Sequence, residues 1–570
     1  MPFILFKNIL KLFDKKHKLY LIFLFFIFFI QMFLELFSVT LFIPLITFVI
    51  NGDLANNSFY LFFLNNLNID LKFFFDNFLY FSIFFGLTFL LRSIIILLCS
   101  RQKLSFTYDL KKFLISKLYN KYLNLPYQNF ISQNSAKYIK NINYEINSTC
   151  EGLLQILEFV SELIVLVGLV SFLLFYSFDF SLITILSLIA IISLINFFTK
   201  NRLQFLGNKV RNFEQLRTKN YIESFNLIKE IKLFNNEKFF YNRDIDFTSG
   251  FLNNDFYYRY IKLFPRILLE MLLIFVLLFV ITLLIDSRDT QFVMEYLGIL
   301  AASSIRLMPS ANRIIVALQS LRFSIPATQN IIKELSKINS NNSKNLIKKF
   351  NFENKLTFKN ISFMYESSDK KIFENFNLEI KPHEILGIKG KTGSGKSTLI
   401  SLITGLISPT KGEIEIDGTN YKDINIKSIH NLFGYVPQNI YLMDSSIKEN
   451  ILFGLKDYSQ TYLNDVVRNA DLTKFLKELP SGIDTRIGEK SSKISGGQSQ
   501  RIGISRALMK KPKILVLDEA TNSLDKFTEN KILETIKSLK KELTIIMISH
   551  NNDSLKICDR VIDLTSVGNK

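Results

Sequence analysis

Cysteine is scarce in this sequence, which contains three among its 570 residues: Cys99, Cys150 and Cys558. They lie far apart, and no ligand spacing joins them. This scarcity excludes a disulfide framework and a zinc site built from cysteines. A small-residue cleavage site is also missing before the first long apolar run, so we expect no cleavable signal peptide.

Basic residues are missing from particular stretches of a chain whose formal net charge is +19. Residues 51–71 and the link at 177–179 contain no Lys or Arg, whereas the segments 101–150 and 200–262 are rich in both. Positive charge near membrane spans marks the cytoplasmic side. We therefore expect both termini inside, long cytoplasmic loops at the two basic segments, and attraction to an anionic leaflet rather than to nucleic acid.

Long apolar runs indicate a membrane domain in the first part of the chain, because about 20 apolar residues cross a bilayer. The expected spans are 19–50, 73–100, 152–177, 179–199, 262–285 and 291–325. An amphipathic interfacial helix is expected at 1–18, and residues 56–67 are either a short external helix or a packed loop. The expected domains are a transmembrane domain at 19–332, a polar linker at 333–345 and a soluble α/β domain at 346–570.

The soluble half contains a phosphate-binding motif between a predicted strand and a predicted helix. "GKTGSGKS", residues 390–397, fits G-x-x-x-x-G-K-S. Backbone N–H groups of such a loop cradle phosphates at a helix N-terminus. The expected ATP-binding residues are Gly390, Lys391, Thr392, Gly393, Ser394, Gly395, Lys396, Ser397 and Thr398. Lys396 supplies a positive charge to the phosphates, and Ser397 supplies an oxygen to Mg²⁺.

A second motif, "KILVLDEATNSLD" at 513–525, is a buried apolar strand that ends in two acids. Asp518 is placed to hold Mg²⁺ through water, and Glu519 is placed to orient or deprotonate the attacking water. An acidic pair after a strand is often a solvated loop, but downstream of a P-loop the catalytic interpretation is favoured.

"ISGGQSQRIGISRAL" at 494–508 resembles the signature of ATP-binding cassette (ABC) ATPases, with Ile in place of the usual first Leu. The resemblance implies that Tyr365 stacks on adenine and that Gln438 contacts the γ-phosphate and Mg²⁺. It implies that His550 is the switch histidine, and that Asp525 lies in the loop facing the opposite subunit. It also implies that Ser495, Gly496, Gly497 and Gln498 face the P-loop of a second cassette.

One cassette fused to six spans resembles an exporter-type half-transporter, which implies a homodimer with two composite ATP sites. The segment 123–142 resembles the first coupling loop of exporters, and 221–240 resembles the helix that crosses to the opposite cassette. The N-terminus carries no peptidase domain, which disfavours an exporter that processes leader peptides.

Four arginines lie at similar depth in the expected inner-leaflet half of the spans: Arg92, Arg266, Arg306 and Arg313. A separation of seven puts Arg306 and Arg313 on nearly one helix face. Snorkelling, and for Arg266 an ion pair with Glu270, are the plain alternatives. Guanidinium groups bind phosphate oxygens in a bidentate fashion, so an arginine ring in a cavity suits a pyrophosphate.

The pattern "PRILLE" with "RLMPSANRI" resembles PglK-type flippases of the bacterial inner membrane. That resemblance implies ATP-driven flipping of a polyprenyl-pyrophosphate-linked oligosaccharide, with the four arginines on its head group. Two alternatives stay open. One is an exporter of another amphiphile, such as a lipid A-like glycolipid or a hydrophobic drug. The other is an ATP-gated regulatory membrane protein, which the intact Glu519 and His550 disfavour.

Overall fold

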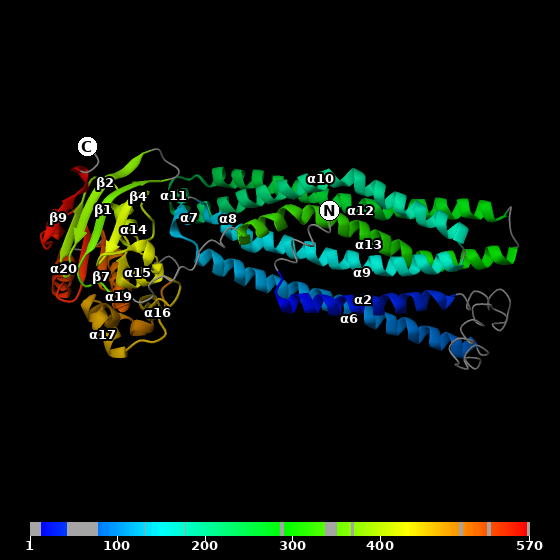
Figure 1. Cartoon of the computed structure of the whole chain (residues 1–570), viewed down its shortest axis with the longest axis horizontal. Coiled ribbons are helices and arrows are strands. Elements are labelled where there is room, and N and C mark those ends of the chain that lie inside the picture. The colour runs from blue at the N-terminus through cyan, green and yellow to red at the C-terminus, as the bar shows by residue number, and fades with distance from the viewer. Residues whose placement is uncertain are drawn as a thin grey trace. The chain divides into compact units, whose positions relative to one another are not determined.

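The computed structural model describes residues 13–42, 78–131, 133–176, 178–285, 290–336, 350–365, 370–488, 494–520 and 526–566 (Figure 1). The chain forms two compact units. The first comprises residues 1–125 and 133–341, and the second comprises 126–132 and 342–570. The expected interfacial helix at 1–18 is described only from residue 13, and the segment 56–67 lies outside the described residues.

The first unit is helical, as predicted. Its long helices are α2 (Lys15–Thr40), α6 (Phe78–Leu123), α9 (Ile146–Tyr176), α10 (Phe178–Asn226), α12 (Glu237–Ile285) and α13 (Thr290–Ser336). Four stretches of the described helices are long and apolar enough to cross a membrane: 15–40, 82–123, 135–175 and 185–226. The fifth and sixth predicted spans lie within α12 and α13.

The two basic segments that were expected as long cytoplasmic loops are mostly helix in the structure. α6 continues to Leu123, and α10 continues to Asn226. In the described residues that separate the long helices lie short elements: α7 (Tyr127–Ile131), α8 (Ser135–Lys140), the π-helix η1 (Asn141–Glu145) and α11 (Ile228–Leu233). Charge distribution predicts the side of the membrane, whereas Lys, Glu, Leu and Gln are good helix formers in water as well.

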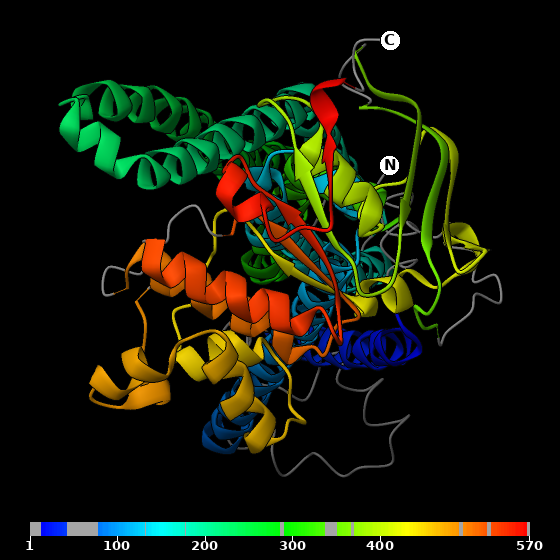
Figure 2. The same cartoon turned by 90° about the vertical axis from the view of Figure 1, so that its left-hand side faces the viewer.

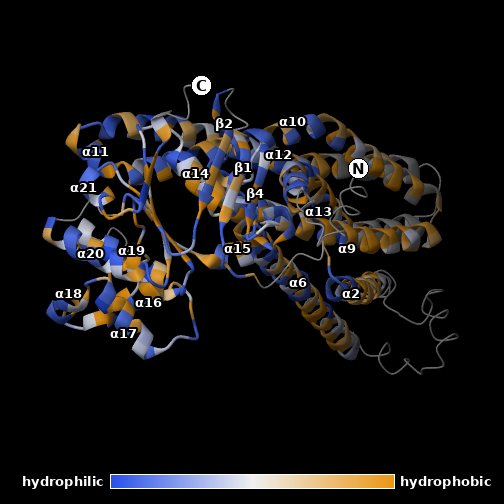
Figure 3. Cartoon of the chain, turned by 60° about the vertical axis from the view of Figure 1, so that its left-hand side comes forward, coloured by the Kyte–Doolittle hydropathy of each residue, from blue (hydrophilic) through white to orange (hydrophobic). Residues whose placement is uncertain are grey.

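Apolar side chains point both inward and outward in this unit, as hydrocarbon solvent allows. On α2, Leu24 and Phe28 are buried, whereas Leu19, Phe26 and Phe33 are each about two-thirds exposed. Figure 3 shows the apolar stretches of α2, α6 and α9 in orange. α10 and α12 run side by side in Figures 1 and 2. A helix that is apolar on all sides is typical of a membrane span.

The second unit contains two sheets. One is antiparallel, with order β2-β1-β4-β5, and the other is parallel, with order β6-β7-β8-β3-β9. The strands are β1 (Leu356–Met364), β2 (Lys371–Ile380), β3 (Ile385–Lys389), β4 (Lys411–Ile416), β5 (Thr419–Asn420), β6 (Phe433–Val436), β7 (Ile514–Asp518), β8 (Thr544–Ile548) and β9 (Arg560–Asp563).

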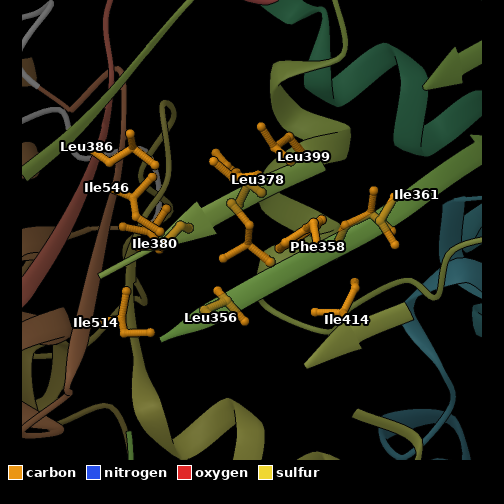
Figure 4. Close-up of a cluster of buried hydrophobic side chains, with 14 of the residues drawn as sticks. Leu356, Phe358, Ile361, Leu378, Ile380, Leu386, Leu399, Ile414, Ile514 and Ile546 are labelled. Carbon is orange, nitrogen blue, oxygen red and sulfur yellow. The ribbon is translucent and has the colours of Figure 1, made fainter. Parts of the chain in front are cut away.

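Buried side chains join the two sheets to the helix that follows the P-loop, α14 (Lys396–Ile403). Figure 4 shows Phe358 and Leu378 of the antiparallel sheet near Leu399 of α14. The central strands β7 and β8 are buried almost throughout, which is why they read as continuous apolar runs. Their carboxyl ends meet at one edge, where α/β proteins bind ligands.

A helical region follows β6 and leads to the signature. It contains α16 (Ile447–Leu452), α17 (Gln460–Asn469) and α18 (Thr473–Glu478). α19 (Gly496–Met509) then precedes β7, and α20 (Lys526–Leu539) follows it. These helices share an apolar core with β7 and β8, so the signature is fixed to the same unit as the P-loop.

Candidate ATP site and intramembrane charge cluster

The P-loop connects β3 to α14, as its sequence predicts. Gly393 and Gly395 have φ angles of 83° and 91°, in the left-handed region that glycine adopts without strain. Lys396 Nζ donates to the carbonyl of Gly390 at 2.7 Å and lies 3.3 Å from that of Lys391. The lysine therefore folds back over its own loop, the arrangement in which its charge faces bound phosphates.

The predicted adenine-stacking residue is placed beside this loop. The Tyr365 hydroxyl lies 3.2 Å from Thr398 Oγ1, in the first turn of the helix that begins at Lys396. Its ring packs edge-on against Phe363 with the centroids 5.0 Å apart. The ring is thus held by one hydrogen bond and one aromatic contact, which leaves its position well defined for stacking.

Glu519, His550 and Gln438 converge at the carboxyl ends of the strands. His550 Nε2 lies 3.0 Å from Glu519 Oε1 and 3.0 Å from Lys396 Nζ. A neutral Nε2 accepts from the lysine, and a protonated one donates to the glutamate, so the tautomer decides which bond forms. Gln438 Nε2 donates to Glu519 Oε2 at 2.8 Å. Both oxygens of Glu519 therefore have fixed partners.

The backbone at Glu519 is strained. Its φ angle is 51°, a left-handed value that is rare for a residue with a long side chain. The Glu519 N–H donates to the Ile548 carbonyl at 3.1 Å, which holds this conformation against β8. Such strain concentrates at active sites, where it aims a side chain.

The donor set beside Glu519 fits Mg²⁺, which prefers oxygen ligands. Asp518 ends β7 and Ser397 lies in the first turn of α14. Burial is the main cause that raises the pKa of Asp518, while the Tyr435 hydroxyl and Lys396 act in the opposite direction. A nearby cation would favour the charged carboxylate further. Asp518, Ser397 and Gln438 would hold the ion, which neutralises phosphate charge when bound.

The signature begins α19 with a capping box. Ser495 Oγ accepts from the Gln498 N–H at 3.2 Å, and the Ser495 N–H donates to Gln498 Oε1 at 2.8 Å. Gly496 and Gly497 form the first helical turn, which is accessible to a ligand. That the signature faces the P-loop of a second cassette stays a prediction. Asp525, predicted to lie in the loop facing the opposite subunit, is outside the described residues.

A buried charge cluster lies in the first unit, and Arg306 is at its centre. Arg306 on α13 pairs with Glu35 on α2, and its Nη2 lies 3.4 Å from Glu162 Oε2 on α9. The side chain of Arg306 is 8 % exposed, that of Glu35 is 0 % exposed and that of Glu162 is 3 % exposed. Three helices are thus joined through one guanidinium group.

Two further arginines border this cluster. Arg313 Nε lies 3.0 Å from Glu162 Oε1, which agrees with the prediction that Arg306 and Arg313 share a helix face. Arg92 Nη2 on α6 lies 4.0 Å from Glu35 Oε2. Ser310 Oγ donates to Glu162 Oε2 at 2.8 Å. Among the residues that the structure describes, three guanidinium groups therefore meet two carboxylates, an excess of one positive charge.

Arg266 does not belong to this cluster, so the expectation of four converging arginines was wrong. Its Nε donates to Glu270 Oε1 at 2.9 Å on its own helix, with the Arg266 side chain 75 % exposed. Because α12 packs on a different side of α13, Arg266 instead lines a cavity of about 380 Å³ with Ser304, Pro309 and Asn312. The one-turn pair with Glu270 satisfies it locally.

Glu162 is the functional candidate that the sequence reasoning missed. It lies in the middle of the third predicted span, where a carboxylate is costly and usually has a partner. Attention to acidic as well as basic residues within the spans would have found it. Glu158, one turn earlier, pairs with Lys103 at 2.8 Å and forms a separate contact.

Comparisons with known proteins agree with this architecture. Residues 373–522 match the family model described as ABC transporter. A putative export ATP-binding/permease protein of Rickettsia felis is 30 % identical over 428 residues, which cover 72 % of this chain and 71 % of the relative. A putative export ATP-binding/permease protein of Rickettsia typhi is 29 % identical over 467 residues, covering 78 % and 79 %.

A solved structure of a bacterial Atm1-family ABC exporter with ATP bound has the same fold. It superposes with a TM-score of 0.83 at 19 % identity, covering 97 % of this chain and 95 % of that one. The similarity thus extends over both units and is not confined to the ATPase domain.

Proposed function

This chain belongs to the family of ABC exporters, and from that premise we propose that it flips a pyrophosphate-linked, lipid-anchored oligosaccharide from the cytoplasmic to the outer leaflet. ATP hydrolysis in the second unit is coupled to transport through the first. We further propose that the chain forms a homodimer with two composite ATP sites. It lies in the inner membrane with both termini on the cytoplasmic side. The charge cluster around Arg306 is the observation that carries it.

The cluster favours an anionic passenger because its charges do not cancel. Glu35 and Glu162 balance two of the three guanidinium groups contributed by Arg92, Arg306 and Arg313. An uncompensated charge inside a membrane domain is costly, so a ligand of opposite charge is stabilised there. A transport path that carries only neutral amphiphiles does not require an excess of positive charge.

Arg313 is the arginine best placed to meet a head group. Its side chain is 43 % exposed, compared with 8 % for Arg306 and 20 % for Arg92. Arg306, held by two carboxylates, positions the cluster, whereas Arg313 shares only one oxygen of Glu162. A phosphate oxygen approaching Arg313 can accept from the N–H groups of its planar fork.

The decisive experiment measures flipping of a fluorescent polyprenyl-pyrophosphate disaccharide in proteoliposomes containing the purified protein. Wild type is expected to flip it with ATP, and Arg313→Gln is expected to reduce the rate about tenfold, a loss typical of one charge-assisted contact. Basal ATPase activity of the variant should stay near that of wild type, since the substitution lies outside the ATPase unit.

Arg259→Gln is the matched control. Arg259 lies on α12, pairs with Asp255 at 2.7 Å and is 76 % exposed, so it is an arginine in an ion pair outside the cluster. Equal flipping by Arg313→Gln and Arg259→Gln would refute the role of the cluster. Flipping of a neutral polyprenyl glycoside at the same rate as the pyrophosphate would refute the anionic substrate and favour an exporter of other amphiphiles.

A further inference from the structure

Tyr435 contacts the carboxylate that is expected to hold Mg²⁺. It lies on β6, next to Val516 of β7 in the parallel register. Asp518 is two residues beyond Val516 and therefore on the same face of the sheet. The Tyr435 hydroxyl donates to Asp518 Oδ2 at 3.1 Å. The hydrogen bond thus follows from the register of two neighbouring strands.

Such a donor stabilises the charged form of Asp518, which is partly removed from water. Burial is the main cause that raises the pKa of its carboxyl, and Glu519 beside it adds repulsion. The bond from Tyr435 opposes both effects and occupies one carboxylate oxygen, so the other oxygen keeps a defined direction. Partners of this kind orient metal-binding carboxylates, and their loss typically weakens metal binding 10–100-fold.

The ring of Tyr435 also belongs to the wall of a cavity of about 400 Å³ on the ATPase unit. Thr404 and Leu406, which follow α14, lie in the same wall, as do Phe453 and Arg506. The phenol therefore connects this wall to the edge of the sheet that holds Asp518 and Glu519. A movement of the cavity wall would therefore shift the Asp518 carboxylate through the side chain of Tyr435.

A short membrane-domain segment belongs to the same compact unit as Tyr435. α7, whose sequence lies between the second and third predicted spans, is grouped with the ATPase domain. Its Tyr127 contributes to the electrostatic environment of the Tyr435 phenol, whose pKa is raised mainly by burial and next by Asp518. The phenol of Tyr435 thus bonds to the expected Mg²⁺ ligand and is within electrostatic reach of a segment connected to the membrane helices.

We propose that Tyr435 is a positioning residue, which orients Asp518 toward Mg²⁺–ATP through its hydroxyl. It touches neither nucleotide nor metal and acts through the carboxylate. This inference rests on the proposed role of Asp518 but not on the identity of the transported substrate. It assigns a function to the tyrosine three residues before Gln438, beyond the phosphate and Mg²⁺ contacts predicted for that glutamine.

The test measures binding of Mn²⁺, as a spectroscopic substitute for Mg²⁺, to the full-length protein with Glu519→Gln and bound ATP. Electron paramagnetic resonance reports the free ion. Tyr435→Phe is expected to weaken Mn²⁺ binding about tenfold while ATP affinity in EDTA stays unchanged. Tyr462→Phe is the control, because the Tyr462 hydroxyl donates to the Leu508 carbonyl at 2.9 Å, outside the site.

Restoring the donor distinguishes positioning from packing. p-Aminophenylalanine at position 435 keeps the ring and an N–H donor, so it should recover most of the Mn²⁺ affinity. Equal Mn²⁺ affinity in wild type and Tyr435→Phe would overturn the proposal. So would a loss that p-aminophenylalanine does not recover, or an equal loss in Tyr462→Phe. Thermal unfolding without nucleotide checks that each variant is folded. If Tyr435→Phe is unfolded, the protein with p-aminophenylalanine at position 435 is compared directly with wild type. Weaker Mn²⁺ binding by the p-aminophenylalanine protein than by wild type would then overturn the proposal.

Discussion

The Nε atom of Arg313 on α13 lies 3.0 Å from Oε1 of Glu162 on α9. The carboxylate is 3 % exposed, so its charge depends on arginine partners rather than on water. Because its second oxygen faces Arg306 and Ser310, one side chain of α9 fixes three groups of α13. The pairing is therefore structural as well as a part of the proposed head-group site.

Glu162→Gln is expected to destabilise the membrane unit. Removing one charge of a buried pair leaves the other uncompensated, at a typical cost of 3–5 kcal/mol. We expect about 3 kcal/mol, at the lower end, since glutamine still accepts from Ser310 and Arg306 keeps Glu35. Reversible unfolding in mixed micelles measures the change.

Glu270→Gln is the comparison variant for that measurement. It breaks the pair of Glu270 with Arg266, whose side chains are 48 % and 75 % exposed and lie one turn apart. Exposed pairs of this kind contribute less than about 0.5 kcal/mol. A loss in Glu162→Gln no larger than in Glu270→Gln would show that the cluster is dispensable for stability.

Glu519→Gln is expected to lower ATPase activity at least ~100-fold without weakening ATP binding. A general base contributes about 10²–10⁴-fold, and glutamine keeps the shape and the bond to Gln438 but cannot accept a proton. Steady-state phosphate release and nucleotide binding separate the two effects. Glu534→Gln, on the exposed face of α20, should retain normal turnover; activity of Glu519→Gln near that level would remove Glu519 as the base.

Much of the ATP site could be predicted because its parts are local in sequence. The P-loop, the acidic end of β7 and the capping box of α19 each fit within a short motif, and the strand order then joins them. The contacts among His550, Lys396 and Glu519 depend on adjacent parallel strands. Their positions were predicted, whereas the sharing of one His550 nitrogen could be seen only in the structure.

The membrane half was predictable in its spans and less so in its side-chain contacts. Hydropathy specifies where a helix crosses but not its rotation, so it could not show that Arg266 faces away from Arg306. Glu35 stands in the sequence as a polar residue within a span, but its pairing with Arg306 joins residues 271 positions apart. Helix packing decides which polar side chains pair across the membrane unit. A helix that is apolar on all sides has no amphipathic pattern that would show which face is buried.

Acidity should act on the nucleotide-free ATPase unit through Asp518. Burial raises its native pKa, so the folded state holds the proton more tightly than the unfolded state. Stability from this residue therefore falls as pH rises from the unfolded pKa, about 3.9, through the native one. Asp518→Asn removes the effect, so we expect its melting temperature at pH 8 to exceed that of wild type by roughly 1–3 °C.

The same variant should lose most of its stabilisation by Mg²⁺ and ATP, because the carboxylate is the expected ligand. Differential scanning fluorimetry of wild type and Asp518→Asn measures both effects. In EDTA it gives the difference in melting temperature, and with Mg²⁺–ATP it gives the stabilisation by the nucleotide and the ion. The difference in melting temperature measured in EDTA should narrow as the pH falls, because the raised native pKa lets Asp518 take up a proton in the folded state. A gap that widens on acidification, or an unchanged response to Mg²⁺–ATP, would contradict the assignment.

The composite ATP site predicts a cross-link between copies of the chain. With Cys558→Ser as background, Ser394→Cys in the P-loop and Ser495→Cys at the signature should be joined by a short bis-maleimide only when ATP draws two cassettes together. Cys99 and Cys150 are buried and should react slowly.

Denaturing electrophoresis should show a covalent dimer. Ser538→Cys on α20 replaces Ser495→Cys in the control, which should stay monomeric. A link formed within one chain, leaving only monomer, would refute the site shared between two copies and with it the proposed arrangement of the homodimer.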